Sequence, residues 1–370
     1  MRLVLFYHSL VSDWNHGNAH FLRGVVRELQ AQGHEVIVCE PKDGWSRHNL
    51  VTEQGPGSIA EFASTFPDLR SVEYDLETLD LDAILDQTDV VMVHEWNPPE
   101  LVRRIGSHRA RGGAYRLLFH DTHHRSASAP HDIDRFALDT YDGILAFGEV
   151  VRERYVRRGW ARRAWTWHEA ADVRLFRPIE GAAIEGDLVW IGNWGDGERC
   201  VEIETFLLEP VRRLALTAKI YGVRYPDHAR RTLAAAGAAY GGWLPNHRVP
   251  EVFARYAVTV HVPRRPYVRA LPGIPTIRMF EALACGIPLV SAPWSDCEGL
   301  FRPADMLRAR DGAEMTAHLR AVLADPELAR ALARSGLETV RARHTCGHRV
   351  DQLLGICAEL GAPARLSEVA

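Results

Sequence analysis

The chain has 370 residues, enough for two domains of ordinary size that can each bury a core of their own. Hydrophobic residues make up 46% of the sequence and charged residues 25%, proportions that exclude a disordered, collagenous or disulfide-scaffold protein. The formal net charge of -4 gives no overall positive field to hold nucleic acid or an anionic membrane, so we expect no nucleic-acid partner.

Short apolar runs alternate with amphipathic stretches along the first half of the chain, which is the pattern of parallel βαβ units. Strands are predicted over 3–8, 35–40, 90–94, 116–120 and 143–147. A helix is predicted over 18–32, and it ends at Gly33 because glycine adopts a left-handed cap at little cost. The first half therefore predicts a doubly wound α/β domain.

A second series of strands is predicted over 187–192, 219–222, 257–262 and 288–292. Residues 168–178 read as an extended connector between the two series, and the tail over 315–360 is predicted to be helical. We expect an N-terminal Rossmann-like domain over 1–178 and a C-terminal one over 179–345, with a last helix within 346–370. Two such domains facing across a cleft would bind a ligand at the carboxyl ends of their strands.

The six cysteines contain no C-x-x-C pair, which excludes a zinc ribbon or thioredoxin motif and indicates reduced thiols. The first residues are too short and polar for a signal peptide, and no apolar run reaches about 18 residues. These features predict a cytoplasmic protein without a transmembrane segment.

The loop after the first predicted strand lacks the G-x-G-x-x-G pattern that a hydride-transfer enzyme would need. It is long and polar, and its Gly17 precedes a helix that begins at Asn18 and whose N-terminus could accept an anion. We place both on the acceptor side of the predicted cleft.

A glycine-rich loop follows the first strand of the second series, with Gly192, Asn193, Trp194 and Arg199. Small residues let backbone N–H groups approach a phosphate, and Arg199 could add a charge-assisted contact. A glycine-rich turn with a solvated arginine is an equally open interpretation.

The segment 264–290 contains the strongest pattern of the chain. A basic, proline-stiffened loop leads into a short helix from Thr276, whose free N–H groups favour a diphosphate. Glu281 lies in the middle of that helix among apolar residues. A carboxylate there needs a partner, and the two hydroxyls of a ribose would provide one.

Several of these segments together resemble the group-1 glycosyltransferases of the GT-B fold, and within them the subset of spore-maturation-protein-like (CgeB-like) proteins. Residues 281–288, EALACGIP, look like the signature E-A-x-A-x-G-x-P, and the loop 192–199 is similar to the family's diphosphate loop. Residues 33–36 match its G-H-x-V turn and 172–178 its D-x-x-x-F-x-P connector. The segment 344–349 resembles the closing segment, after which a last helix returns to the first domain.

The resemblance implies a hexosyltransferase-like enzyme that moves a sugar from a nucleoside-diphosphate sugar to a hydroxyl-bearing acceptor with retention of configuration, using no metal and no further cofactor. It implies that Glu281 binds the ribose. We expect donor contacts from this residue and from seven others: Gly192, Asn193, Trp194, Arg199, Gly273, Thr276 and Arg278. Arg199 and Arg278 would neutralise the leaving diphosphate, which is a catalytic role.

Two positions depart from the family pattern. Gly273 stands where group-1 enzymes usually carry a second glutamate, and Glu204 stands where they carry a lysine. The subset's pattern G-x-x-T-x-R-x-F-E is present at 273–281, so we interpret the departures as divergence within the fold, with loss of activity as an alternative.

Polar clusters follow two strands of the first series, and we expect them at the acceptor side of the cleft. Glu95 and Trp96 follow one strand; Asp121, His123 and His124 follow the next. A carboxylate–histidine pair could act as a general base, so Asp121 and His123 are the catalytic candidates of an inverting mechanism. Metal binding and satisfied polar residues at strand ends are the alternatives.

Glu169 in the connector could position donor or acceptor, or simply form hydrogen bonds. The acceptor itself is not identified by the sequence: a glycan, a lipid-linked glycan and a small molecule all fit. A nucleotide-sugar epimerase and a non-catalytic sugar-nucleotide-binding protein are the alternative functions.

Overall fold

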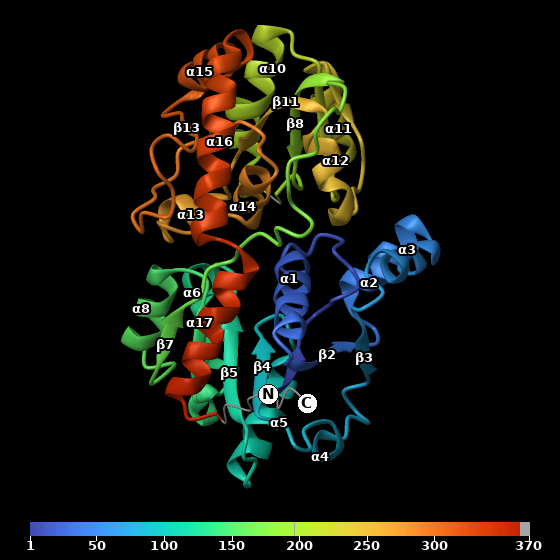
Figure 1. The fold of residues 1–370 in the computed structure, drawn as a ribbon, viewed down its shortest axis with the longest axis vertical. Coiled ribbons are helices and arrows are strands. Elements are labelled where there is room, and N and C mark those ends of the chain that lie inside the picture. Colours follow the sequence, from blue (N-terminus) through green and yellow to red (C-terminus); the bar gives the residue numbers. More distant parts are fainter. Residues whose placement is uncertain (196, 363–370) are drawn as a thin grey trace. The chain divides into compact units, whose positions relative to one another are not determined.

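The computed structural model describes residues 1–195 and 197–362 and divides the chain into two compact units. The first unit contains Met1–Glu169 together with the segment from Cys346, and the second contains Ala170–Thr345. The connector residues 170–178 thus belong to the second unit. Both units are layered α/β structures (Figure 1).

The first unit is built on a parallel sheet that has seven strands among the described residues, in the order β3-β2-β1-β4-β5-β6-β7. The strands are β1 (Arg2–Phe6), β2 (Glu35–Pro41), β3 (Ser71–Tyr74), β4 (Val90–His94), β5 (Arg116–Asp121), β6 (Gly143–Ala146) and β7 (Ala164–Thr166). All five predicted strands are confirmed. The two strands that were not predicted, β3 and β7, are short edge strands with much of their length outside the core, so they lack a continuous apolar run.

Helices cover this sheet, and residues 3–6 of β1 are fully buried because of that cover. In chain order the helices are α1 (Asn18–Ala31), α2 (Trp45–Gln54), α3 (Gly57–Thr65), α4 (Leu81–Ile84), α5 (Pro99–Ala110), α6 (Arg125–Ser128), α7 (Pro130–Asp134), the 3-10 turn η1 (Leu138–Thr140), α8 (Glu149–Arg157) and α17 (Cys346–Glu359). The helix predicted from residue 18 is confirmed as α1.

Helix α17 comes from the end of the chain and packs against α1, which comes from its beginning (Figure 1). Gln32 Nε2 donates to Asp351 Oδ1 over 3.3 Å, and the indole of Trp167 donates to the carbonyl of Arg349 over 2.8 Å. The helix begins at Cys346, at the start of the segment predicted to contain the last helix. The last part of the segment, 363–370, lies outside the described residues.

The second unit contains a parallel sheet with six strands among the described residues, in the order β10-β9-β8-β11-β12-β13. They are β8 (Gly186–Ile191), β9 (Ala218–Tyr221), β10 (Ala238–Tyr240), β11 (Tyr256–His261), β12 (Leu289–Ser291) and β13 (Leu307–Arg308). The four predicted strands are confirmed as β8, β9, β11 and β12. The two edge strands, with three and two residues, are too short to leave a periodic signal.

The remaining segments of the second unit are mostly helical. They are α9 (Cys200–Ile203), the π-helical turn η2 (Glu204–Leu208), α10 (Glu209–Leu214), α11 (Asp227–Ala235), the 3-10 turn η3 (Asn246–Arg248), α12 (Val249–Phe253), α13 (Arg265–Arg269), α14 (Ile277–Ala284), α15 (Gly312–Ala324) and α16 (Pro326–Arg343). The start of α16 is capped: Asp325 Oδ1 accepts the N–H groups of Glu327 and Leu328, and Pro326 occupies the first helical turn.

The strand order of each sheet reverses beside its first strand, between β1 and β4 in one unit and between β8 and β11 in the other. Ligands of open parallel sheets bind outside the carboxyl ends of the strands at such a switch point. A functional site is therefore expected at the carboxyl ends of β1 and β4 and at those of β8 and β11. Among the described residues, no helix combines the length and the apolar character needed to cross a bilayer.

Candidate functional site

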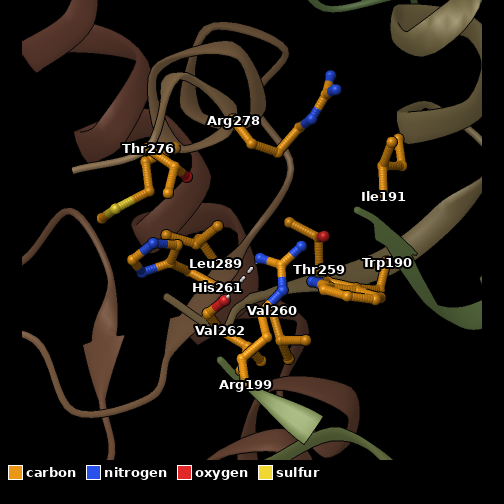
Figure 2. A pocket seen from close by; sticks show the side chains of 11 residues that line it. Trp190, Ile191, Arg199, Thr259, Val260, His261, Val262, Thr276, Arg278 and Leu289 are labelled. Atoms are coloured by element: carbon orange, nitrogen blue, oxygen red, sulfur yellow. Dashed lines mark hydrogen bonds between the residues drawn. The ribbon is translucent and has the colours of Figure 1, made fainter. Parts of the chain in front are cut away.

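A small cavity of about 30 Å³ lies at the switch point of the second unit (Figure 2). Its walls come from the ends of β8 and β11, from β12 and from the beginning of α14. The lining residues are Trp190, Ile191, Arg199, Thr259, Val260, His261, Val262, Thr276, Arg278, Met279 and Leu289. Three predicted donor residues, Arg199, Thr276 and Arg278, are brought together there.

Arg199 is buried beneath the glycine-rich loop. Its Nη1 donates to the carbonyl of Val262 over 3.1 Å, and its Nη2 donates to the carbonyl and side-chain oxygens of Asn193 over 2.8 and 2.7 Å. The guanidinium also lies 5.1 Å from the ring centroid of Trp190. Because Arg199 is engaged by these groups, it fixes the loop and brings a buried positive charge to the cavity wall.

Two positions of this loop accept only glycine. Gly195 has a φ of +92°, and a Cβ there would lie 2.5 Å from Cγ of Arg199. At Gly192, a Cβ would lie 2.9 Å from the Trp190 ring. The glycines therefore let the backbone close over Trp190 and Arg199. Trp194, a predicted donor residue, is instead buried in the hydrophobic core beside Tyr225, and it does not line the cavity.

The beginning of α14 carries the other cationic group. Thr276 is the N-cap residue, and its side chain makes no capping hydrogen bond, so the N–H groups of the first turn have no side-chain cap. Arg278 pairs with Glu281 one turn further along the helix, where its Nη1 lies 2.5 Å from Oε2 of Glu281. The other carboxylate oxygen of Glu281 accepts from the amide of Asn246 over 3.2 Å.

Glu281, the residue predicted to bind the ribose, already has side-chain partners in the structure. Its side chain is fully buried, and both of its oxygens are engaged by Arg278 and Asn246. Each carboxylate oxygen can accept a second hydrogen bond, but because the side chain is fully buried, a ribose could reach it only if the surrounding side chains move. In the observed arrangement Glu281 instead orients Arg278, whose side chain is 23% exposed.

Gly273 lies in the loop that precedes α14, with a φ of +90°. A Cβ at this position would lie 2.7 Å from Oε1 of Glu298 and 3.0 Å from Sγ of Cys297. The side chain of Glu298 thus occupies the space that a glutamate at 273 would need. Glycine instead of glutamate at position 273 is thus explained by the positive φ and by the lack of space beside Glu298.

A glutamate at 273 is therefore expected to harm this protein. For Gly273→Glu we expect a loss of about 1–3 kcal/mol in the free energy of unfolding, because a side chain is strained at this φ and collides with Glu298. Urea denaturation would measure it. Gly57→Glu is the control, since a side chain at Gly57 meets nothing within 4 Å. Unchanged stability together with faster sugar transfer would contradict this account.

His261 is a cavity residue that the sequence argument missed. It ends β11 with a side chain that is almost fully buried. Burial and the neighbouring Arg199 lower its pKa to about 3, so the ring is neutral at ordinary pH. The sequence could have indicated His261, because it is a polar residue at the carboxyl end of a mostly apolar strand.

The first unit gathers buried polar groups at its own switch point. Among them are three imidazoles, His16, His94 and His120, each with one buried ring nitrogen that has no hydrogen-bond partner among the described residues. Burial lowers the pKa of all three, that of His120 to about 3. Asn18, a predicted acceptor-side residue, is buried there at the start of α1, and its amide is likewise unbonded among the described residues. Gly17 precedes it and is exposed.

Asp121 is fully buried at the end of β5. Its Oδ1 accepts the N–H of His123 over 2.9 Å, and its Oδ2 accepts the hydroxyl of Tyr155 over 2.8 Å. Desolvation raises its pKa from 3.8 to about 6 despite these hydrogen bonds. The carboxylate therefore bonds the backbone N–H of His123, and both of its oxygens are held by internal donors.

Glu95 is also fully buried, and its Oε2 lies 2.6 Å from Nη2 of Arg125. Burial raises its pKa well above the ordinary value, while Arg125 acts in the opposite direction. The same guanidinium lies 4.4 Å from the ring of Trp96, which is half-buried and in edge contact with His123. Both residues were predicted to lie on the acceptor side. Trp96 is partly exposed at the surface, whereas Glu95 is buried.

The two other predicted acceptor-side residues lie on different segments. His124 is buried, and its Nδ1 is 2.8 Å from the hydroxyl of Ser128. Glu169 is half-buried at the end of the first unit's first segment and does not belong to a helix or strand. No group of three or more His, Cys, Asp or Glu side chains among the described residues is arranged to hold a metal ion.

The raised pKa of Asp121 has a consequence for stability. Because the folded-state pKa is about 6 against an ordinary 3.8, folding favours the protonated form, and this stabilisation is lost as pH rises from about 4 to 6. We expect Asp121→Asn to gain stability relative to wild type over this range, as measured by thermal unfolding at several pH values. The exposed Asp68→Asn is the control. A difference that does not change with pH would contradict the pKa assignment.

Comparison with known proteins gives a family match over part of the chain and a fold for nearly all of it. Residues 200–355 match the family described as Glycosyl transferase-like. Among curated protein sequences none matches the chain. Solved structures match along nearly its whole length. Sucrose-phosphate synthase from Thermosynechococcus elongatus has 15% identity and a TM-score of 0.67, covering 98% of this chain and 99% of the other.

Two further structures show the same architecture. The Anabaena protein Alr3699/HepE, in complex with UDP and glucose, has 12% identity and a TM-score of 0.68, covering 97% of this chain and 99% of the other. An alpha-glucosyltransferase in complex with UDP and a 13-mer DNA has 12% identity and a TM-score of 0.71, covering 97% and 100%. The chain thus has two parallel-sheet α/β domains of the GT-B fold, as predicted.

Proposed function

We propose that this GT-B glycosyltransferase moves a sugar from a nucleoside-diphosphate sugar, with a UDP-sugar as the first candidate, to a hydroxyl-bearing acceptor. The observation that carries the proposal is the meeting of Arg199, Arg278 and the beginning of α14 at one cavity on the switch point of the second sheet. Two guanidinium groups and uncapped N–H groups suit a diphosphate. UDP in the HepE and alpha-glucosyltransferase complexes supports the choice of donor.

In this proposal Arg278 contacts the diphosphate and stabilises the charge that develops as it leaves. Glu281 is a positioning residue, because its ion pair fixes the direction of Arg278. Arg199 contributes its charge from the cavity wall and keeps the loop at Gly192 and Asn193 closed. A direct ribose contact from Glu281 would require the side chains that bury its carboxylate to move.

We propose retention of configuration at the anomeric carbon. The bond from that carbon to the diphosphate breaks, the acceptor oxygen bonds on the same face, and the acceptor proton passes to the departing phosphate. The state of Asp121, the base candidate of an inverting reaction, supports this choice because both of its oxygens accept internal hydrogen bonds. The reaction as proposed needs no metal and no further cofactor.

The acceptor is proposed to bind at the switch point of the first unit. The buried imidazoles of His16, His94 and His120 are neutral, and each has a ring nitrogen with no hydrogen-bond partner in the part of the chain that the structure describes. Such nitrogens suit hydroxyl groups better than an anion. A glycan, lipid-linked or small-molecule acceptor fits this chemistry, and the net charge of -4 favours these over nucleic acid. We also propose a cytoplasmic location, consistent with six cysteines that form no disulfide, and membership of the spore-maturation-protein-like subset.

A donor screen tests the proposal. Thermal unfolding of the full chain would be followed with UDP-, GDP-, dTDP- and CMP-sugars, since a ligand at 100 times its Kd stabilises by about 2.7 kcal/mol. The stabilising donor would then be incubated with candidate acceptors while NMR follows the anomeric proton of the product. A retained configuration supports the mechanism, and an inverted product contradicts it. Conversion of the donor without an acceptor would instead indicate an epimerase, and binding without turnover a non-catalytic protein.

A further inference from the structure

One buried ring nitrogen in the cavity wall has no hydrogen-bond partner among the described residues. His261 lies between Arg199 and the beginning of α14 (Figure 2), and its side chain is almost fully buried. Its Nε2 is buried and has no hydrogen-bond partner among the described residues. Buried polar atoms are normally hydrogen-bonded, so an unbonded one in a cavity wall points to a ligand.

The hydrogen bonds of Ser291 define which nitrogen of His261 carries the proton. The hydroxyl of Ser291 donates its single hydrogen to the carbonyl of Ala292 over 2.8 Å. Its oxygen can therefore only accept from Nδ1 of His261, which is 2.9 Å away. Burial and Arg199 keep the pKa of the ring low, so the imidazole is neutral and holds this one hydrogen. Nε2 is consequently a hydrogen-bond acceptor.

We infer that Nε2 of His261 accepts a hydrogen bond from a hydroxyl of the bound nucleotide sugar, an inference that rests on the proposed function. An ionised phosphate carries no hydrogen and cannot satisfy this acceptor. The cavity of about 30 Å³ has room for a hydroxyl group and is too small for a base or a pyranose ring. The hydroxyl belongs to the ribose or to the transferred sugar, the two parts that flank the diphosphate.

Two substitutions of His261 separate the two nitrogens. In His261→Asn the amide can still donate to Ser291 from near the Nδ1 position, but nothing replaces Nε2. In His261→Gln the longer side chain can bring its carbonyl oxygen near the Nε2 position. Calorimetry on the full chain would measure binding of UDP, 2′-deoxy-UDP and UDP-glucose. We expect His261→Asn to bind about five- to tenfold more weakly, and His261→Gln to recover most of the loss.

The three ligands identify the hydroxyl. If it is the ribose 2′-hydroxyl, wild type binds UDP more tightly than 2′-deoxy-UDP, and His261→Asn abolishes that preference. If UDP-glucose alone is weakened, the hydroxyl belongs to the sugar. Binding of UDP and UDP-glucose by His261→Asn with wild-type affinity would overturn the inference. If wild type binds none of the UDP, dTDP and GDP ligands or their sugars, the proposed function itself fails.

Discussion

Replacement of Arg278 by alanine is expected to lower kcat/KM of sugar transfer by about 100- to 1000-fold, the cost of removing one preorganised donor to developing charge. Arg278 lines the cavity at the beginning of α14 and is aimed by Glu281. Because its contact strengthens as the diphosphate leaves, kcat should fall more than KM rises. Steady-state kinetics with the donor identified in the screen would measure both.

Two variants separate catalysis from folding in this experiment. Removal of Arg278 leaves the carboxylate of Glu281 buried without its cation, so the double variant Arg278→Ala with Glu281→Gln should restore thermal stability while transfer stays low. Arg330→Ala is the matched control, because Arg330 pairs with Glu327 one helical turn away in the same way but on the exposed surface of α16. Near-normal transfer by the double variant would show that Arg278 does not touch the donor.

Replacement of Arg125 by methionine is expected to destabilise the folded chain by about 3–5 kcal/mol at neutral pH, the usual result of leaving one partner of a buried ion pair alone. Glu95 is fully buried and lies 2.6 Å from Arg125, which also covers the ring of Trp96. The cost should decrease at lower pH, because a protonated Glu95 no longer needs a cation. Urea denaturation at pH 5 and pH 8 would measure both effects.

A double variant tests the source of this loss. Arg125→Met combined with Glu95→Gln removes both charges and should regain most of the stability. Arg157→Met is the control, since Arg157 pairs with Glu153 on an exposed helix face and should cost less than about 1 kcal/mol. If the double variant is as unstable as Arg125→Met, the guanidinium acts through packing on Trp96 and the charge on Glu95 is immaterial.

The sequence predicted the central strands of both sheets and failed only at the edges. Strands such as β1 and β4 are buried on both faces, so each has a continuous apolar run that can be recognised locally. The edge strands β7 and β13 have three and two residues and half-buried side chains. These strands form by pairing with a neighbouring strand, and the hydrophobic pattern of a few consecutive residues does not show that pairing.

The candidate site was predicted in part. Arg199, Thr276 and Arg278 were expected together, and the cavity brings them together. The sequence also singled out Glu281 as a buried carboxylate that needed a partner; its partners are Arg278, one helical turn away, and Asn246, which is distant in the sequence. Whether a carboxylate meets a ligand or another side chain depends on such distant residues.

Taken alone, the amino-acid order determined the α/β class, the two strand series and the loops that follow them, because hydrophobic periodicity and turn residues act over a few neighbouring positions. The tertiary structure decided which polar groups have partners. Ser291 orients the ring of His261, Arg125 neutralises Glu95, and Glu298 fills the space beside Gly273. Desolvation and hydrogen bonding are set by groups that the fold brings together from distant positions, and these contacts decide which side chains are available to a ligand.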